Sequence, residues 1–163
     1  MDRSEKESVR MSHPSVEAEA MRLAIEASRQ ARKAGDTPFG ATLVSPEGEI
    51  LHTSPNRQNT TGDCTAHAEL VLVREATKKL GPARLRGATV FASGEPCAMC
   101  SGAMFWAGIS RVVFAATTQD IGDTLGGPSL PARCAEVLGP AQPAVEVQGE
   151  MMREEAVAVL QGR

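Results

Sequence analysis

ATVFASGEPCAMCSGAMFWAGISRVVFAA, residues 88–116, is the stretch that decides the fold of this chain. Its first six residues form an apolar run that is typical of a buried strand. Pro96 follows soon after, and because proline suits the first turn of a helix, a helix is predicted from there to about Ala107. RVVFAA, residues 111–116, is a second apolar strand. Strands that alternate with helices predict an α/β layered fold with a largely parallel sheet.

The residues before this stretch predict two more helices and a hairpin. SVEAEAMRLAIEASRQARKAG, residues 15–35, is rich in helix formers and stops at its glycine. Two short strands, 41–45 and 49–53, flank the turn-forming sequence Pro-Glu-Gly, which predicts a hairpin. A polar loop over 54–64 then leads into a second helix over 65–81.

The residues after this stretch predict a loop, two helices and one strand. Residues 117–131 contain three glycines and two prolines, which indicate a long loop of a length class that is often functional. A short helix near 132–138, a strand near 144–147 and a last helix over 150–160 complete the chain. In α/β sheets of this kind, sites form at the carboxyl ends of the strands.

The composition is that of a globular protein. Of 163 residues, 42% are hydrophobic and 23% are charged, with a net charge of -3. A compact domain usually has roughly 100 to 200 residues, so one domain over 15–163 is expected, behind a mobile tail over 1–14. The charge excludes a strongly cationic nucleic-acid binder, although not a local basic groove. We find no apolar signal segment and no run of ~18 apolar residues, so a cytoplasmic protein without a membrane span is expected.

Residues 96–100, PCAMC, form the most specific motif. A Pro-Cys-x-x-Cys run is expected only about 0.005 times in a chain of this composition, whereas a His-x-acid pair is expected about 0.4 times. Cys97 and Cys100 lie three apart on one helical turn, and His67 at the start of the preceding helix adds a third ligand. Three protein ligands leave the fourth position of zinc open, as in catalytic sites. Glu69 is close enough to His67 to reach a water at that position.

Other interpretations of these residues stay open at this point. The zinc site is structural if Cys64, three residues before His67, supplies a fourth ligand, and plain buried thiols are a further alternative. Cys134 is interpreted as a small core residue. His13 and His52 have no partner at ligand spacing and are expected to be solvated. One basic cluster is either a nucleic-acid patch or, more commonly, a solvated helix end: Lys78, Lys79, Arg84 and Arg86.

Residues 38–116 resemble the cytidine deaminase-like superfamily, on the branch that holds guanine deaminase, fungal-type cytosine deaminase and tRNA adenosine deaminase. The resemblance rests on PFGA, an Asn-containing loop, TAHAE, EPCAMC and GAMFWAGISRVVFAA in that order, and His-x-Glu followed by Pro-Cys-x-x-Cys is the signature of zinc nucleobase deaminases. It implies a three-layer α/β/α sandwich with a five-stranded mixed sheet, and dimers or larger assemblies. It also implies one zinc per subunit, held by His67, Cys97 and Cys100, with Glu69 as the catalytic proton shuttle.

The same resemblance implies four substrate-binding residues. Asn56 matches a position where related deaminases hydrogen-bond the base, although an Asn here is otherwise a turn residue. Phe39 matches a ring-stacking position, and simple core packing is its alternative. Ala68 lies between His67 and Glu69. Trp106 is expected to form a pocket wall, or else to be a core aromatic at the end of a helix.

The expected reaction is release of ammonia from an aminated, nucleobase-like ring, with guanine or a related free base as the first expectation. A tRNA adenosine deaminase is the alternative, but the chain ends in GEMMREEAVAVLQGR, which is acidic and free of aromatics. Cytosine, a pterin, a triazine or a nucleoside, and a non-catalytic zinc-stabilised module, are further alternatives. No aromatic residue follows Phe114, so any lid must be aliphatic. Asp120 or Asp123 is the candidate acid for an amino group of the ring. The expected partners are therefore a heterocyclic amine, water and a second copy of the chain, without nucleic acid or membrane.

Overall fold

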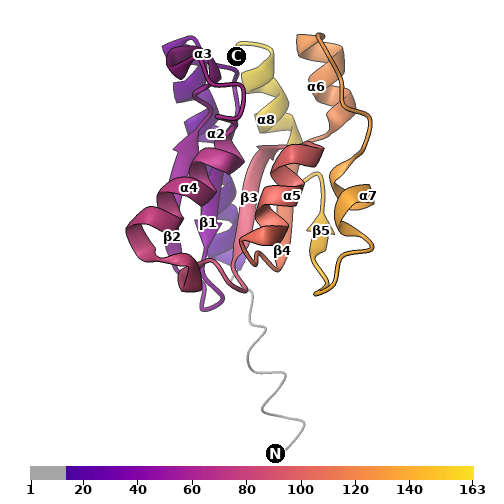
Figure 1. The fold of residues 1–163 in the computed structure, drawn as a ribbon. Helices are drawn as coiled ribbons and strands as arrows, with labels where there is room; N and C mark the ends of the chain where they lie inside the picture. The colour runs from indigo at the N-terminus through magenta and orange to yellow at the C-terminus, as the bar shows by residue number, and fades with distance from the viewer. Residues whose placement is uncertain (1–13) are drawn as a thin grey trace, which may run out of the picture.

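A computed structural model describes residues 14–163 as a five-stranded mixed sheet between two layers of helices (Figure 1). The strand order is β2-β1-β3-β4-β5. β1 runs antiparallel to both β2 and β3, whereas β3, β4 and β5 are parallel. This confirms the predicted hairpin, the parallel pair of strands around the Cys motif and the predicted fold class. The strands are β1 (Gly40–Val44), β2 (Ile50–Pro55), β3 (Thr89–Gly94), β4 (Arg111–Ala116) and β5 (Glu146–Gln148).

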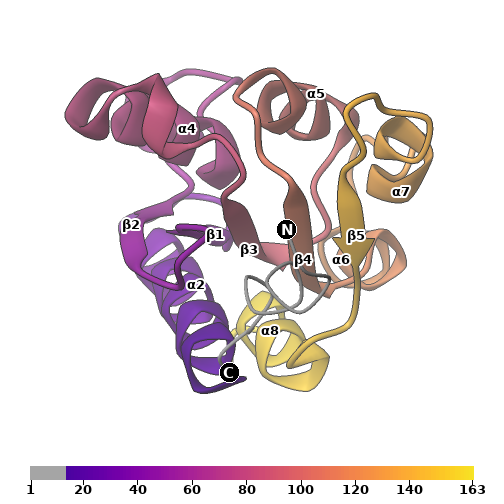
Figure 2. The ribbon, with the colours of Figure 1, turned by 90° about the horizontal axis from the view of Figure 1, so that it is seen from below.

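The helices divide between the two faces of the sheet, as the view along it shows (Figure 2). α2 (Pro14–Ala34) and α8 (Arg153–Leu160) cover one face. The other face carries α4 (Ala68–Leu80), α5 (Ala98–Trp106) and α7 (Cys134–Leu138). Three more helices complete the described chain: α3 (Gln58–Thr61), η2 (Pro82–Arg84) and α6 (Thr118–Leu125).

Alternation along the strands builds a core on each face. Val90 and Val112 pack in the cluster beneath α4, α5 and α7, whereas their neighbours Phe91 and Val113 pack beneath α2 and α8. Much of the core consists of Ala, Val, Leu and Met, as the low aromatic content predicts. Gly40 lets α2 approach closely, because a Cβ there would lie 2.1 Å from the carbonyl oxygen of Ala24.

Several element boundaries differ from the sequence prediction. Residues 117–131 are not loop throughout, since α6 occupies their first half, and β5 lies two residues later than predicted at its start. α4 begins at Ala68 because His67 is still extended, with φ -63 and ψ 151. Pro14 belongs to α2. The remainder of the predicted tail, residues 1–13, lies outside the described residues. Within residues 14–163, no helix combines the length and apolarity that a bilayer crossing requires.

Candidate active site

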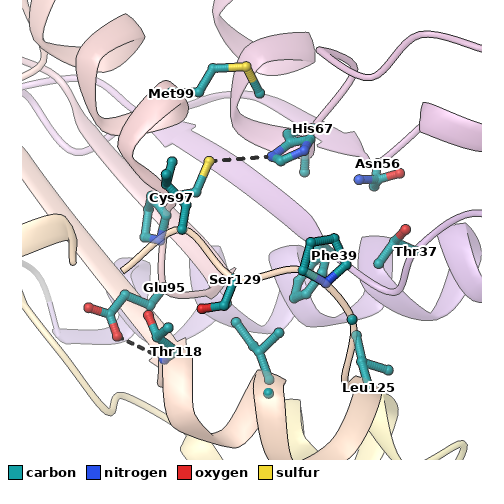
Figure 3. Close-up of a pocket in the computed structure, with 18 of the residues that line it drawn as sticks. Thr37, Phe39, Asn56, His67, Glu95, Cys97, Met99, Thr118, Leu125 and Ser129 are labelled. Carbon is teal, nitrogen blue, oxygen red and sulfur yellow. Dashed lines mark hydrogen bonds between the residues drawn. The ribbon is translucent and has the colours of Figure 1, made fainter. Parts of the chain in front are cut away.

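A cavity of about 570 Å³ opens at the carboxyl ends of β3 and β4, where the rule for α/β sheets predicts a site (Figure 3). The N-termini of α4 and α5 form its floor, the segment after β2 forms one wall, and α6 with the residues that follow it forms the opposite wall. The side chains drawn around it in Figure 3 include Phe39, Asn56, His67, Cys97 and Leu125.

His67 and Cys97 line the floor of this cavity, and the fully buried Cys100 lies next to them, so the three come together as predicted. Their ligand atoms all lie within 4.8 Å of one another. His67 is the N-cap residue of α4 and Cys97 that of α5, so both helix dipoles favour negative charge at this point. The Nδ1 atom of His67 lies 3.6 Å from Cys97 Sγ and 3.5 Å from Cys100 Sγ.

These separations fit zinc. A tetrahedral ion with Zn–S bonds of about 2.3 Å and Zn–N bonds of about 2.0 Å holds sulfur and nitrogen about 3.5 Å apart. The donor set of two thiols and one imidazole is also one that zinc prefers. Cys64 is exposed and lies outside this group, so it does not supply a fourth ligand. Cys134 is buried in the core, as predicted.

The two thiols differ in how readily they lose their protons when no metal is bound. A hydrogen bond from Cys100 lowers the pKa of Cys97 to about 4, although burial opposes this shift. The same bond, together with burial, raises the pKa of Cys100, so the metal-free pair shares one proton. A bound cation removes that proton as well, because thiolate is the form that coordinates.

Glu69 lies in the first turn of α4 and lines the cavity beside the triad. This residue is only 6% exposed. Burial raises the pKa of its carboxyl group, against smaller opposing effects that include a hydrogen bond with Cys100. A carboxylate whose pKa is raised accepts a proton more readily than an ordinary one, and a proton shuttle must accept a proton and then return it.

Asn56 follows β2 and is almost fully buried at the cavity wall. Its Oδ1 accepts a hydrogen bond of 3.0 Å from the backbone N–H of Gln58, and its Nδ2 donates to Gln58 Oε1 at 2.8 Å. Because a backbone N–H can only donate, the orientation of the Asn56 amide is fixed. In Figure 3 the amide nitrogen faces the side of His67.

Phe39 and Ala68 also line the cavity, as predicted. The Phe39 ring lies against Gly94 at the end of β3, where an added Cβ would be 2.7 Å from the ring. Trp106 differs from the prediction. It is absent from the cavity lining, and with 84% exposure it is not a core aromatic either. It lies at the end of α5, where its ring makes an angle of 70° with that of Phe105 at a centroid distance of 5.0 Å.

The two candidate acids after β4 do not reach the cavity. Asp120 caps α6 together with Thr117 and forms a bidentate ion pair with Arg153. Its carboxylate therefore has its partners already. Asp123 is exposed and does not line the cavity. The interior acid of this region is Glu95, which follows β3 directly.

Glu95 is a buried acid that the sequence patterns did not single out. Its side chain is 2% exposed, accepts a 2.9 Å hydrogen bond from the backbone N–H of Thr118 and pairs with Arg133. Burial raises the pKa of Glu95, but the bonds from Arg133 and Thr118 outweigh this effect and lower the pKa overall. The one feature of the sequence that could have drawn attention to Glu95 was its position directly before Pro96. The partners lie 23 and 38 residues away, so the sequence alone did not indicate them.

The remaining charged candidates lie outside the cavity. His52 is not simply solvated, since its Nε2 lies 2.6 Å from Glu75 Oε2. The basic cluster around η2 is exposed, with Arg84 near Glu49 and Lys79 near Glu75, as on a solvated helix end.

Known proteins match this chain in sequence and in structure. The family model of the cytidine and deoxycytidylate deaminase zinc-binding region matches residues 14–116. A probable cytosine deaminase of Schizosaccharomyces pombe is 38% identical over 144 residues, which are 84% of this chain and 85% of that protein. A tRNA-specific adenosine deaminase of Bacillus subtilis is 42% identical over 96 residues, 59% of each protein. The X-ray structure of guanine deaminase from Bacillus subtilis superposes with a TM-score of 0.62 and 34% identity over 71% of each chain.

These relatives share one reaction type, the hydrolytic removal of an amino group, although their names give different substrates. The family model spans both motifs that meet at the cavity floor. The chain therefore belongs to the cytidine and deoxycytidylate deaminase family of zinc-dependent hydrolytic deaminases.

Proposed function

We propose that this deaminase acts on a small, uncharged, aminated base, with guanine as the first candidate. The observation that carries the proposal is the chemistry of the cavity wall: among the described residues that line it there is neither lysine nor arginine. Phosphate groups are normally held by such cations. A nucleotide or a tRNA strand would find no such partner in this wall, whereas a neutral ring needs none.

The apolar side chains of the cavity suit a flat ring. Phe39 lies on one wall, and Leu125 with Leu130 lies on the other. Leu125 is 38% exposed and Leu130 is 58% exposed, so a ring between the walls would remove apolar surface from water. One N–H of Asn56 Nδ2 is donated to Gln58, and the nitrogen lies on the side of His67, so its second N–H can donate to a carbonyl oxygen or an unprotonated ring nitrogen of the substrate.

The reaction follows from the position of Glu69. When zinc is bound by His67, Cys97 and Cys100, it lowers the pKa of a coordinated water from 15.7 toward ~7. Glu69 takes a proton from the attacking water as the water oxygen bonds to the ring carbon, and delivers that proton to a ring nitrogen. It then carries the second proton of the water, now on the hydroxyl group, to the departing amine. The bond between the ring carbon and the amino nitrogen breaks, and ammonia leaves. Ala68 and Phe39 hold the ring plane and exclude bulk water.

Cytosine is the second candidate substrate, for two reasons. The probable cytosine deaminase of Schizosaccharomyces pombe matches this chain over 85% of its own length. In addition, the wall formed by α6 and the residues after it carries only aliphatic large side chains at the cavity, namely Ile121, Leu125 and Leu130. A smaller ring requires less aromatic stacking surface than a purine does.

A substrate panel tests the proposal. We expect the zinc-loaded protein to release ammonia from guanine or cytosine, with kcat/KM for a free base at least about 100-fold above that for the matching 5′-nucleotide, because the wall offers the phosphate no cation. The measurement is ammonia release over free bases, nucleosides, nucleotides, pterins and triazines.

The same panel includes tRNA, scored by inosine formation and by a gel shift. Tight binding with editing would replace the free-base proposal with the tRNA alternative. Stoichiometric zinc without ammonia from any ring or tRNA would indicate a non-catalytic zinc-stabilised module.

The zinc-binding thiols are suited to a reducing compartment, which supports a cytoplasmic location.

We also propose that two copies of the chain associate through α5. Met99, Gly102 and Trp106 recur at helical spacing along this helix, and Met99 and Trp106 are both exposed. Met99 lines the cavity, so a second copy on this stripe would also border the site. Exposed apolar side chains that lie on one face of a helix are typical of an interface.

Trp106→Glu is expected to convert the dimer into monomers at micromolar concentration, because a carboxylate in an apolar interface loses its hydration. Light scattering after size-exclusion chromatography measures the mass. Leu80→Glu is the matched control, since Leu80 is exposed but lies at the end of α4. A wild-type protein that is monomeric, or a Trp106→Glu variant that stays dimeric, would contradict the proposed interface.

A further inference from the structure

The wall of the cavity after α6 is a strap, residues 126–132, with little to hold it. Gly126, Gly127, Pro128, Ser129, Leu130 and Ala132 all line the cavity. Within residues 14–163, backbone–backbone hydrogen bonds from or to residues 127–132 do not occur, and Ser129 forms no side-chain hydrogen bond. Segments without such bonds and with high exposure have low local stability. The position of the strap therefore depends on what fixes its ends.

Both ends of the wall are tied to one carboxylate. Glu95 Oε1 accepts from the backbone N–H of Thr118, at the start of α6, at 2.9 Å. On the far side of the strap, Arg133 donates to the same side chain, from Nε at 3.1 Å and from Nη2 at 2.8 Å. Figure 3 shows Glu95 and Thr118 joined in this way, and Cys97 and Ser129 line the same cavity.

The pairing is costly to break because Glu95 is interior. Its side chain is 2% exposed, whereas that of Arg133 is 50% exposed. A buried carboxylate that loses a charged partner retains its desolvation cost, so the pair is strongly favoured over separation. Glu95 itself is fixed at the end of β3, two residues before Cys97. The pair therefore sets the distance between the strap and the metal ligands.

We infer that Arg133 is a positioning residue: through Glu95 it holds the 126–132 strap over the cavity and thereby sets the affinity for the ring. The inference rests on the proposed function in one respect, that the cavity binds the ring. Arg133 does not line the cavity, so it acts on substrate only through the strap. Its removal should loosen the apolar wall while Glu69 and the three ligands keep their places.

The test compares Arg133→Met with the wild-type zinc protein on the best base of the substrate panel. KM is expected to rise about tenfold, which corresponds to one charge-assisted contact, with kcat within about twofold of wild type. Arg133→Lys keeps a charge but loses the bidentate geometry, and is expected to raise KM about threefold. If Arg133→Met does not fold, Arg133→Lys serves as the test variant in its place.

Arg153→Met is the matched control. Arg153 is 49% exposed and forms an equally bidentate pair, with Nη2 2.6 Å and Nε 2.8 Å from the Asp120 carboxylate. This pair joins α6 to α8, however, and Asp120 does not line the cavity. A loss of stability alone should appear in both variants, whereas the rise in KM is expected only at Arg133.

A second measurement does not depend on deaminase activity. Digestion by subtilisin, with the cut sites located by mass spectrometry, is expected to cleave Arg133→Met within 126–132 faster than wild type or Arg153→Met. Wild-type protein that deaminates no base would refute the proposed function, while this digestion still tests the strap. Equal digestion of all three proteins, an unchanged KM in Arg133→Met, or a fall in kcat at constant KM would overturn the inference.

Discussion

Glu69→Gln is expected to keep its zinc and to lower kcat by about 10³-fold, the usual worth of a positioned general acid and base. Glutamine has nearly the same shape as glutamate, so the floor of the cavity keeps its packing. Its amide, however, cannot take a proton from water and return it to the ring. Ammonia release measures the loss, and elemental analysis of the purified protein measures the zinc.

Glu75→Gln is the control for this experiment. Glu75 lies on the same helix as Glu69, but it faces His52 and Arg57, away from the cavity. Its replacement is expected to leave kcat unchanged. Wild-type turnover in Glu69→Gln would show that another group moves the proton. Loss of zinc in this variant would instead mean that the carboxylate contributes to metal binding.

Cys97→Ser, or removal of the metal by a chelator, is expected to abolish ammonia release and to destabilise the fold. If free zinc is about 1,000-fold above its Kd, binding contributes about 4 kcal/mol to the free energy of unfolding. For a chain of this size the loss corresponds to about 10 °C in Tm. Without the ion, the two thiols and the imidazole lose the partner that joins α4 to α5.

Cys64→Ser separates loss of a ligand from loss of any thiol. Cys64 is exposed and outside the metal group, so this variant is expected to keep zinc, activity and Tm. Differential scanning calorimetry with and without chelator gives the stability, and zinc returned to the stripped protein should restore turnover. Full zinc content in Cys97→Ser, or zinc loss in Cys64→Ser, would require a different ligand set.

Much of this fold could be predicted because its signals are local. α2, the hairpin, α5 and β4 each follow from periodicity, from a turn sequence or from a proline at a helix start. α6 was missed because the glycines and prolines of residues 117–131 predict a loop. Its sequence nevertheless contains a helix-start signal, Thr117 followed three residues later by Asp120, which together form a capping box.

Part of the site could likewise be predicted from short sequence motifs, whereas the rest depends on contacts between residues that are far apart in the sequence. His67, Glu69 and the two cysteines belong to short motifs, so their meeting at one cavity could be predicted. The partners of Glu95 and His52 could not, since each ion pair joins residues that are far apart in sequence. Trp106 was misplaced for a related reason: sequence spacing puts it on α5, but only the packing of that helix decides which way it faces.

The exposure of Trp106 has a practical consequence for solution work. The chain contains one tryptophan and no tyrosine, so its intrinsic fluorescence arises almost entirely from this one indole. In the single subunit the indole is 84% exposed and in contact with water, so the monomer is expected to emit at long wavelength. A second subunit that covers α5 would move this emission to shorter wavelength. Dilution of the unlabelled protein thus makes this single side chain a spectroscopic reporter of subunit dissociation.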